Sequence, residues 1–168
     1  MNEIKYFINT KIPGTTWVVQ KYIEKPLLYD GRKFDIRIWA MITHKGELFY
    51  YKHGYIRTSS DFYTLDNLKE NYIHLTNNCL QKHGEKYGIH EEGNTLSFEN
   101  FKAFLKQKFP NIPIDFEHHI IPRIKDLIID CYLAAKNEIN IHRRKNCFEF
   151  LGFDFMIDED FKVWLIEV

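Results

Sequence analysis

Two carboxylates, Asp154 and Glu167, stand inside the apolar runs that end the sequence, GFDFMIDEDFKVWLIEV. The runs flank an acidic turn and predict a β-hairpin, in which successive side chains point to opposite faces. A loop of two or four residues would put both acids on one face, whereas a loop of three would separate them. A buried carboxylate needs a cation or hydrogen bonds. Either acid could pair with a lysine or arginine, but two together favour Mg²⁺, which takes one or two carboxylates and fills its other positions with phosphate oxygens and water.

The two faces of this hairpin are expected to carry different side chains. One face would hold the apolar set Leu151, Phe153, Phe155 and Ile157. The other would hold the two acids together with Val163 and Leu165. Because apolar residues then occur on both faces, we expect the hairpin to lie centrally in a sheet and to be largely buried.

Charges alternate along a second stretch, KFDIRIW, so that one side of a strand would carry Lys33, Asp35 and Arg37. The apolar residues between them would face the opposite side. This pattern is most often a strand with one solvent-facing side. If that side instead meets the two acids, with Arg57 beside it, cations and acids line one pocket. Such a pocket suits phosphoryl chemistry, because arginine grips phosphate or carboxylate through two parallel hydrogen bonds.

The stretch HLTNN supplies neutral donors and acceptors in Thr76, Asn77 and Asn78. Residues of these types most often form a turn or a helix cap. They could also bind a ribose or a phosphate, and the spacing leaves both readings open.

The remaining pattern predicts the elements that must position these residues. Strands are expected over 17–23, 33–43 and 48–57, with a loop over 26–32. Helices are expected over 61–70, 98–109 and 117–139, the second capped by Ser97. Pro122 fits the last helix only in its first turn. Strands first, helices next and a hairpin last predict an α+β fold, with a largely antiparallel sheet covered by helices.

Composition restricts the class of function. Lys+Arg and Asp+Glu both total 23, so the net charge is zero, which argues against a general nucleic-acid binder. The three cysteines show neither disulfide-framework nor metal-ligand spacing and fit a reducing compartment. No apolar run approaches a membrane span, and the N-terminus lacks the apolar core of a signal peptide. We therefore expect a soluble intracellular protein that binds neither nucleic acid nor membrane.

Five stretches occur in a fixed order from about residue 17 to residue 168: VVQKYIEKPLLYDGRKFDIRIW, the arginine of GYIRTS, HLTNNCLQ, EEGN and FEFLGFDFMIDEDFKVWLIEV. Taken together, this ordered set resembles the tubulin tyrosine ligase family. The resemblance implies the ATP-grasp fold of that family, and with it ATP and Mg²⁺ as cofactors.

The resemblance also implies a role for each matching residue. The segment that holds adenine would be Gln20, Lys21, Tyr22 and Ile23. Further nucleotide contacts would come from Lys33, Asp35, Thr76 and Asn77. The Mg²⁺ ligands would be Asp154 and Glu167. The catalytic cations, which handle phosphate and the amino-acid or peptide carboxylate, would be Arg37 and Arg57.

In this family, ATP phosphorylates a glutamate carboxylate of tubulin, and the amine of a free amino acid then attacks the acyl phosphate. The resemblance therefore implies a ligase in the cytoplasm, at the cytoskeleton or cilium, whose protein partner is the acidic C-terminal tail of tubulin. HLTNNCLQ and EEGN look closest to the tyrosine-adding member and favour tyrosine. A polyglutamylase or glycylase is the alternative within the family, and a catalytically inactive tubulin-binding scaffold is the alternative outside enzymes.

The family pattern continues Glu-x-Asn after the hairpin, whereas this sequence reads Glu167, Val168 and ends. The family's N-terminal region and its nucleotide-binding lobe would precede residue 1. We therefore expect residues 1–168 to be a partial catalytic domain, incomplete at both ends. Alone, it is expected not to ligate and to bind ATP poorly.

Overall fold

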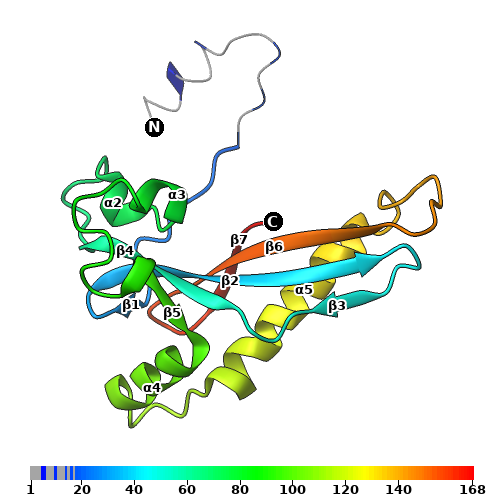
Figure 1. The fold of residues 1–168 in the computed structure, drawn as a ribbon. Helices are drawn as coiled ribbons and strands as arrows, with labels where there is room; N and C mark the ends of the chain where they lie inside the picture. The colour runs from blue at the N-terminus through cyan, green and yellow to red at the C-terminus, as the bar shows by residue number, and fades with distance from the viewer. Residues whose placement is uncertain (1–4, 7–9, 11–13, 15, 17) are drawn as a thin grey trace.

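The protein is built on one antiparallel sheet, seen in a computed structural model that describes residues 5–6, 10, 14, 16 and 18–168 (Figure 1). Within this described part the sheet has seven strands, with the path β5-β4-β2-β6-β7 and with β1 and β3 also paired to β2. The strands are β1 Leu28–Tyr29, β2 Arg32–Thr43, β3 Leu48–Tyr50, β4 Tyr55–Phe62, β5 Thr95–Ser97, β6 Phe148–Ile157 and β7 Val163–Glu167.

The central strand is β2, which confirms the strand predicted over 33–43. It pairs with β4 and then β3 along one edge, and with β1 and then β6 along the other. Its alternate residues therefore face the two sides of the sheet from a position flanked by other strands. On the charged side of β2, Lys33 and Asp35 are each 6% exposed because the residues around His74 and Thr76 lie over them.

The strand predicted over 48–57 is divided into β3 and β4. Tyr50 pairs with Ala40 and Tyr55 with Arg37, so four residues span the two positions between them on β2. The prediction of one continuous strand was wrong because Gly54 interrupts it at a close approach. A Cβ on Gly54 would lie 2.6 Å from the Phe98 ring, and closer still to the carbonyl oxygen of Arg37.

The stretch before β2 also differs from expectation. Residues 18–23 form no strand, because no strand of the described chain runs beside them, and Trp17 lies outside the described residues. The chain joins the sheet only at Pro26, which bridges to Asp158. The predicted loop over 26–32 contains β1 and a tight turn at Asp30–Gly31, where φ values of 45° and 78° suit the twist of a hairpin.

Helices cover both faces of the sheet, and two of the three predicted helices are found. The helix α4, Phe98–Lys108, begins at the Ser97 cap as predicted. The helix α5, Ile121–Ala135, places Pro122 in its first turn and follows a π-helical turn at 116–120. It ends four residues before the predicted end at 139.

No helix forms over 61–70, so that prediction was wrong. Asp61 and Phe62 complete β4, because Phe62 pairs with Arg32. The short helices α2, Asn71–His74, and α3, Asn78–Gln81, follow instead, and they lie over the opposite face of the sheet from α4 and α5 (Figure 1).

The apolar core lies between the sheet and the helices α4 and α5. Phe34 packs on Phe101 with ring centroids 4.9 Å apart, and Ile36 and Ile38 are fully buried. Ile124 of α5 is also fully buried. The predicted α+β fold with a helix-covered antiparallel sheet is confirmed. Among the described residues, no helix has the length and apolarity needed to cross a membrane.

Candidate active site

The two acids of the terminal hairpin lie directly opposite each other, Asp154 on β6 and Glu167 on β7. The connecting loop has five residues, 158–162, between the paired residues Ile157 and Val163. In a regular hairpin this loop would place residue 166 opposite Asp154. An irregularity between Asp154 and Phe155 shifts the register by one residue, so the two acids share a face.

The same shift overturns the predicted position of two apolar residues. Val163 pairs with Ile157 and Leu165 with Phe155, so both belong to the core face rather than to the face of the acids. The predicted apolar face of β6 is otherwise confirmed, because Phe153, Phe155 and Ile157 are buried.

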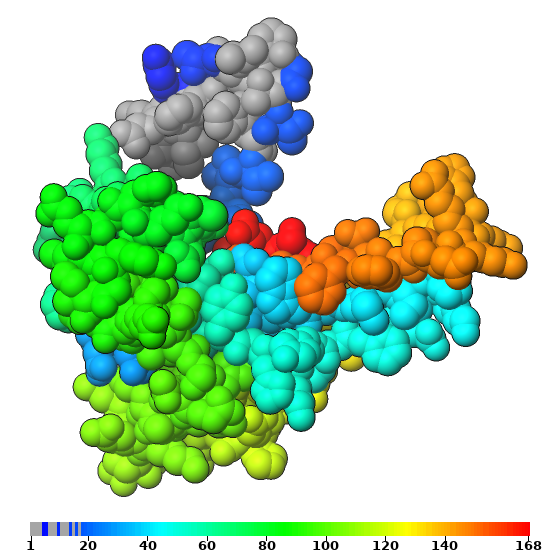
Figure 2. All heavy atoms as spheres, viewed as in Figure 1, coloured from blue at the N-terminus to red at the C-terminus, as the bar shows by residue number. Residues whose placement is uncertain are grey.

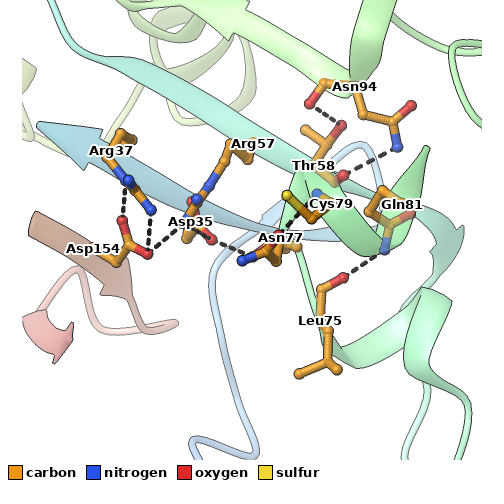
Figure 3. A network of polar contacts seen from close by, with 11 residues as sticks. Asp35, Arg37, Arg57, Thr58, Leu75, Asn77, Cys79, Gln81, Asn94 and Asp154 are labelled. Carbon is orange, nitrogen blue, oxygen red and sulfur yellow. Dashed lines mark hydrogen bonds and ion pairs between the residues drawn. The ribbon is translucent and has the colours of Figure 1, made fainter. Parts of the chain in front are cut away.

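Asp154 is the centre of an ion network, shown in Figure 3. Arg37 grips its carboxylate through Nε and Nη2, the latter 2.9 Å from Oδ2. Arg57 donates through Nη2 to the same oxygen at 2.6 Å. Asp154 is 3% exposed and Arg57 is 6% exposed, so these are desolvated ion pairs. The pKa of Glu167 is raised because of its hydrogen bond to Asp154 and its partial burial.

Arg57 also joins this network to Asp35 on β2. Its Nε and Nη2 lie 2.6 Å and 2.8 Å from the two carboxylate oxygens of Asp35, which also accepts a hydrogen bond from Thr76. Burial raises the pKa of Asp35, while Arg57 and Thr76 oppose that effect. Two acids, Asp35 and Asp154, and two arginines, Arg37 and Arg57, therefore lie on one face of the sheet. Each arginine is paired with at least one of the two carboxylates.

Lys33 completes the charged face at the end nearest α2. Its ammonium donates to the carbonyl oxygen of His74 at 2.8 Å and to the hydroxyl of Tyr22 at 3.1 Å. Burial lowers the pKa of Lys33 to about 8, and nearby Asp35 acts in the opposite direction. The ammonium also lies 4.6 Å from the centre of the Tyr22 ring. The charged side of KFDIRIW therefore does not face solvent throughout, and its cations and acids meet Arg57 and Asp154 in one network.

A second buried network was missed by sequence reasoning. Arg32 is 2% exposed and pairs bidentately with Glu91, which also accepts from the Thr58 hydroxyl at 2.9 Å. Asn94 donates to the carbonyl oxygen of Thr58 at 3.1 Å. Glu91 and Asn94 belong to the stretch EEGN. This stretch therefore stabilises β4 through its hydrogen bonds with Thr58. The only sign of this network in the sequence was Arg32, a further arginine at the start of β2.

The predicted site residues do not all come together. The site brings together the set Tyr22, Lys33, Asp35, Arg37, Arg57, Thr76, Asp154 and Glu167. The side chains of Gln20 and Lys21 are exposed, and Ile23 is half-buried. Asn77 uses its side-chain oxygen to cap α3 by accepting from the amide of Cys79 at 2.8 Å. This is the commoner of the two roles considered for HLTNN.

The donor set at the hairpin fits Mg²⁺ in part. Two carboxylates meet on one face, and a hard cation of this size takes one or two of them. In the described residues no group of three or more His, Cys, Asp or Glu could hold a metal. Other ligands would have to come from phosphate oxygens and water. Asp154 would also have to exchange part of its contact with Arg37 or Arg57 for the metal.

The family model for the Tubulin-tyrosine ligase family matches residues 1–168, the whole length of the sequence. The chain belongs to this family. Members of the family that resemble it include tubulin glycylase 3A of Drosophila melanogaster, which is 41% identical over 100% of the chain. Tubulin monoglycylase TTLL3 of Homo sapiens is 39% identical over 90% of the chain, and tubulin glycylase 3C of Tetrahymena thermophila is 38% identical over 99%.

This member of the tubulin-tyrosine ligase family covers only part of each relative. It spans 17% of the Drosophila protein, 20% of the human protein and 16% of the Tetrahymena protein. All three relatives are named as glycylases, so the preference for tyrosine that HLTNNCLQ and EEGN suggested finds no support among them.

Proposed function

We propose that the full-length protein is an ATP-dependent ligase that joins an amino acid, glycine first among the candidates, to a glutamate carboxylate of tubulin. The observation that carries this proposal is the Asp154 network. It unites two arginines and two acids on one sheet face in a chain that is 38–41% identical to tubulin glycylases. Residues 1–168 would be part of the catalytic domain.

The proposed reaction has two steps. A carboxylate oxygen of the acceptor glutamate attacks the γ-phosphorus of ATP, and ADP leaves. The amine nitrogen of the amino acid then attacks the acyl carbon, phosphate leaves, and the amine loses a proton. Arg37 and Arg57 would stabilise charge on the transferred phosphoryl group and on the tetrahedral intermediate. Asp154 and Glu167 would hold Mg²⁺, which neutralises phosphate oxygens when bound.

The remaining assignments follow from the same proposal. Lys33, Asp35 and Thr76 would contact the nucleotide, with Asn77 beside them, and residues 20–23 would hold adenine. The acidic tail of tubulin is the proposed protein partner, which places the protein in the cytoplasm at the cytoskeleton or cilium. A polyglutamylase or a tyrosine ligase uses the same chemistry with a different amine.

The test is incorporation of labelled glycine, glutamate or tyrosine into tubulin by the full-length protein with ATP and Mg²⁺. We expect glycine to be incorporated, and Asp154→Asn and Glu167→Gln each to lower the rate roughly 100-fold or more. Asp160→Asn, in the exposed turn of the same hairpin, is the matched control and should have no effect. Normal turnover in Glu167→Gln would contradict the metal assignment. No incorporation by the wild-type protein would favour a scaffold without activity.

A further inference from the structure

The segment of residues 20–24 lies against the sheet without belonging to it. It has no strand pairing, and Val18 and Val19 just before it are 79% and 70% exposed. Something other than a β-ladder must therefore fix its position. Three side chains contact this segment, those of Lys33, Tyr63 and His74.

His74 is the hub of these contacts. Its Nδ1 lies 2.8 Å from the hydroxyl oxygen of Tyr22, and its Nε2 lies 3.0 Å from the carbonyl oxygen of Asn67. Its ring stands edge-on to the rings of Tyr22 and Tyr63, with centroids 5.6 Å and 5.7 Å away. Tyr63 in turn donates its hydroxyl to the carbonyl oxygen of Glu24 at 2.8 Å. The ring of His74 thus lies between Tyr22, which belongs to the segment, and Tyr63, which binds the segment from outside it.

The chemistry of each atom fixes the direction of this chain of hydrogen bonds. A carbonyl only accepts, so Nε2 of His74 carries a proton, and in the neutral ring Nδ1 accepts from Tyr22. The hydroxyl of Tyr22 then has its oxygen free to accept from Lys33, whose ammonium can only donate. Lys33 also donates to the backbone carbonyl of His74, which closes a ring of contacts around the hydroxyl. The Tyr22 hydroxyl thus donates to His74 and accepts from Lys33.

We propose that His74 is a positioning residue that holds the 20–24 segment, and with it the adenine end of the bound nucleotide, against β2. The inference rests on the proposed function, because that proposal assigns residues 20–23 to adenine. His74 is 8% exposed and reaches the segment through Tyr22, through Tyr63 and through the shared contact with Lys33. Substitution of His74 should therefore weaken binding of the adenine end of the nucleotide. It should leave Arg37 and Arg57, which are proposed to bind the phosphates, in place.

Two substitutions of His74 distinguish the role of Nε2, which donates to Asn67, from the role of Nδ1, which accepts from Tyr22. His74→Gln can retain a donor toward Asn67 but removes the acceptor for Tyr22. His74→Asn can retain an acceptor near the position of Nδ1. In the full-length protein, we expect His74→Gln to raise the dissociation constants of ATP and of AMP by the same factor, about 5–10-fold. His74→Asn should recover most of that loss. His118→Gln, at a side chain that is 83% exposed, is the matched control.

Tyr22→Phe provides an independent variant and a test of coupling. It should weaken ATP binding at least as much as His74→Gln, because it removes both the contact with His74 and the acceptor for Lys33. The double variant should bind no more weakly than Tyr22→Phe alone, because the contact with His74 is already lost there. Hydrogen exchange of the amides of residues 18–25 should be faster in both variants. Titration calorimetry measures the affinities, and neither measurement needs turnover.

The outcomes separate this inference from the proposed function. If the wild-type protein binds no ATP, the proposed function fails and this inference fails with it. If the wild-type protein binds ATP and both variants bind it equally well, the inference alone is overturned, even where exchange becomes faster. An equal loss in His74→Asn and His74→Gln would also overturn it, because it would mean that the histidine only packs.

Discussion

The ammonium of Lys33 is buried. It donates hydrogen bonds to Tyr22 and His74 and lies over the ring of Tyr22. Its pKa of about 8 lies below the ordinary lysine value of 10.5 because burial disfavours the charged form. Between these two values the unfolded chain binds more protons at this residue than the folded protein does. The free energy of unfolding contributed by Lys33 should therefore rise as the pH rises through that window.

The prediction compares wild-type protein with Lys33→Met, which cannot titrate at this position. Between pH 8 and pH 10, urea unfolding should show the wild-type protein gaining stability relative to the variant, whatever their difference at pH 7. A matched control is Lys108→Met, whose exposed side chain lies at the end of α4. Parallel stability curves for wild type and Lys33→Met would contradict the depressed pKa.

At the residue scale, the sequence predicted which side of a strand each residue takes better than it predicted whether that side is buried. The alternation in KFDIRIW correctly placed Lys33, Asp35 and Arg37 on one side, because the period of a strand is fixed by its geometry. It could not show that this side is buried, because burial depends on α2, α3 and the strands on both edges of β2. His74 was not identified, because its partner Tyr22 is 52 residues away and no local spacing links them.

At the element scale, the junction between β3 and β4 depends on Gly54. Gly54→Ala should lower the free energy of unfolding by about 1–3 kcal/mol, because the new Cβ would meet the carbonyl of Arg37 and the Phe98 ring, and backbone cannot yield as a flexible side chain does. The measurement is denaturant unfolding. Lys52→Ala, two residues earlier and exposed, should leave stability nearly unchanged. Equal effects of the two substitutions would show that the close approach relaxes without cost.

Sequence patterns also fail to predict the pairing register between some of these elements. The terminal hairpin was predicted, and so was the possibility that its loop length decides which face each acid takes. The irregularity beside Phe155 was not predictable, because nothing in VWLIE marks an extra residue. The helix expected over 61–70 failed for a related reason. Phe62 is drawn into β4 by pairing with Arg32, and that tertiary pairing overrides local propensity.

At the scale of the whole molecule, β3 and the adjoining parts of β2 and β6 form an arm of the sheet (Figure 2), and α5 contacts this arm on its core side. On the same side as Asp154, this arm carries an aromatic face that we define by Trp39, Phe49, Tyr51, Phe148 and Phe150. Trp39 and Phe150 stack with ring centres 5.0 Å apart. The four members other than Trp39 are 53–68% exposed, so together they form a large exposed apolar surface.

The aromatic face predicts how the isolated 168-residue chain should behave. We expect it to self-associate at micromolar concentration, and the double substitution Phe148→Lys with Phe150→Lys to reduce that association clearly. Sedimentation velocity measures both. Leu68→Lys changes an equally exposed apolar residue outside this face, 67% exposed, and should have little effect. Association that Leu68→Lys reduces as much as the double substitution would show that general charge, rather than this face, controls it.

The central strand places apolar anchors of the core and charged groups of the candidate site at alternate positions of a single run of residues. Substitution can alter either set one position at a time. A change in length inside the strand alters both sets together unless a bulge absorbs it, because one residue inserted between Asp35 and Ile36 would turn Arg37 toward the core face and Ile36 toward the face of Asp154. We therefore expect β2 to tolerate substitutions more readily than insertions or deletions. Insertions should be tolerated best in turns such as the one at 44–47, where no alternation is at stake.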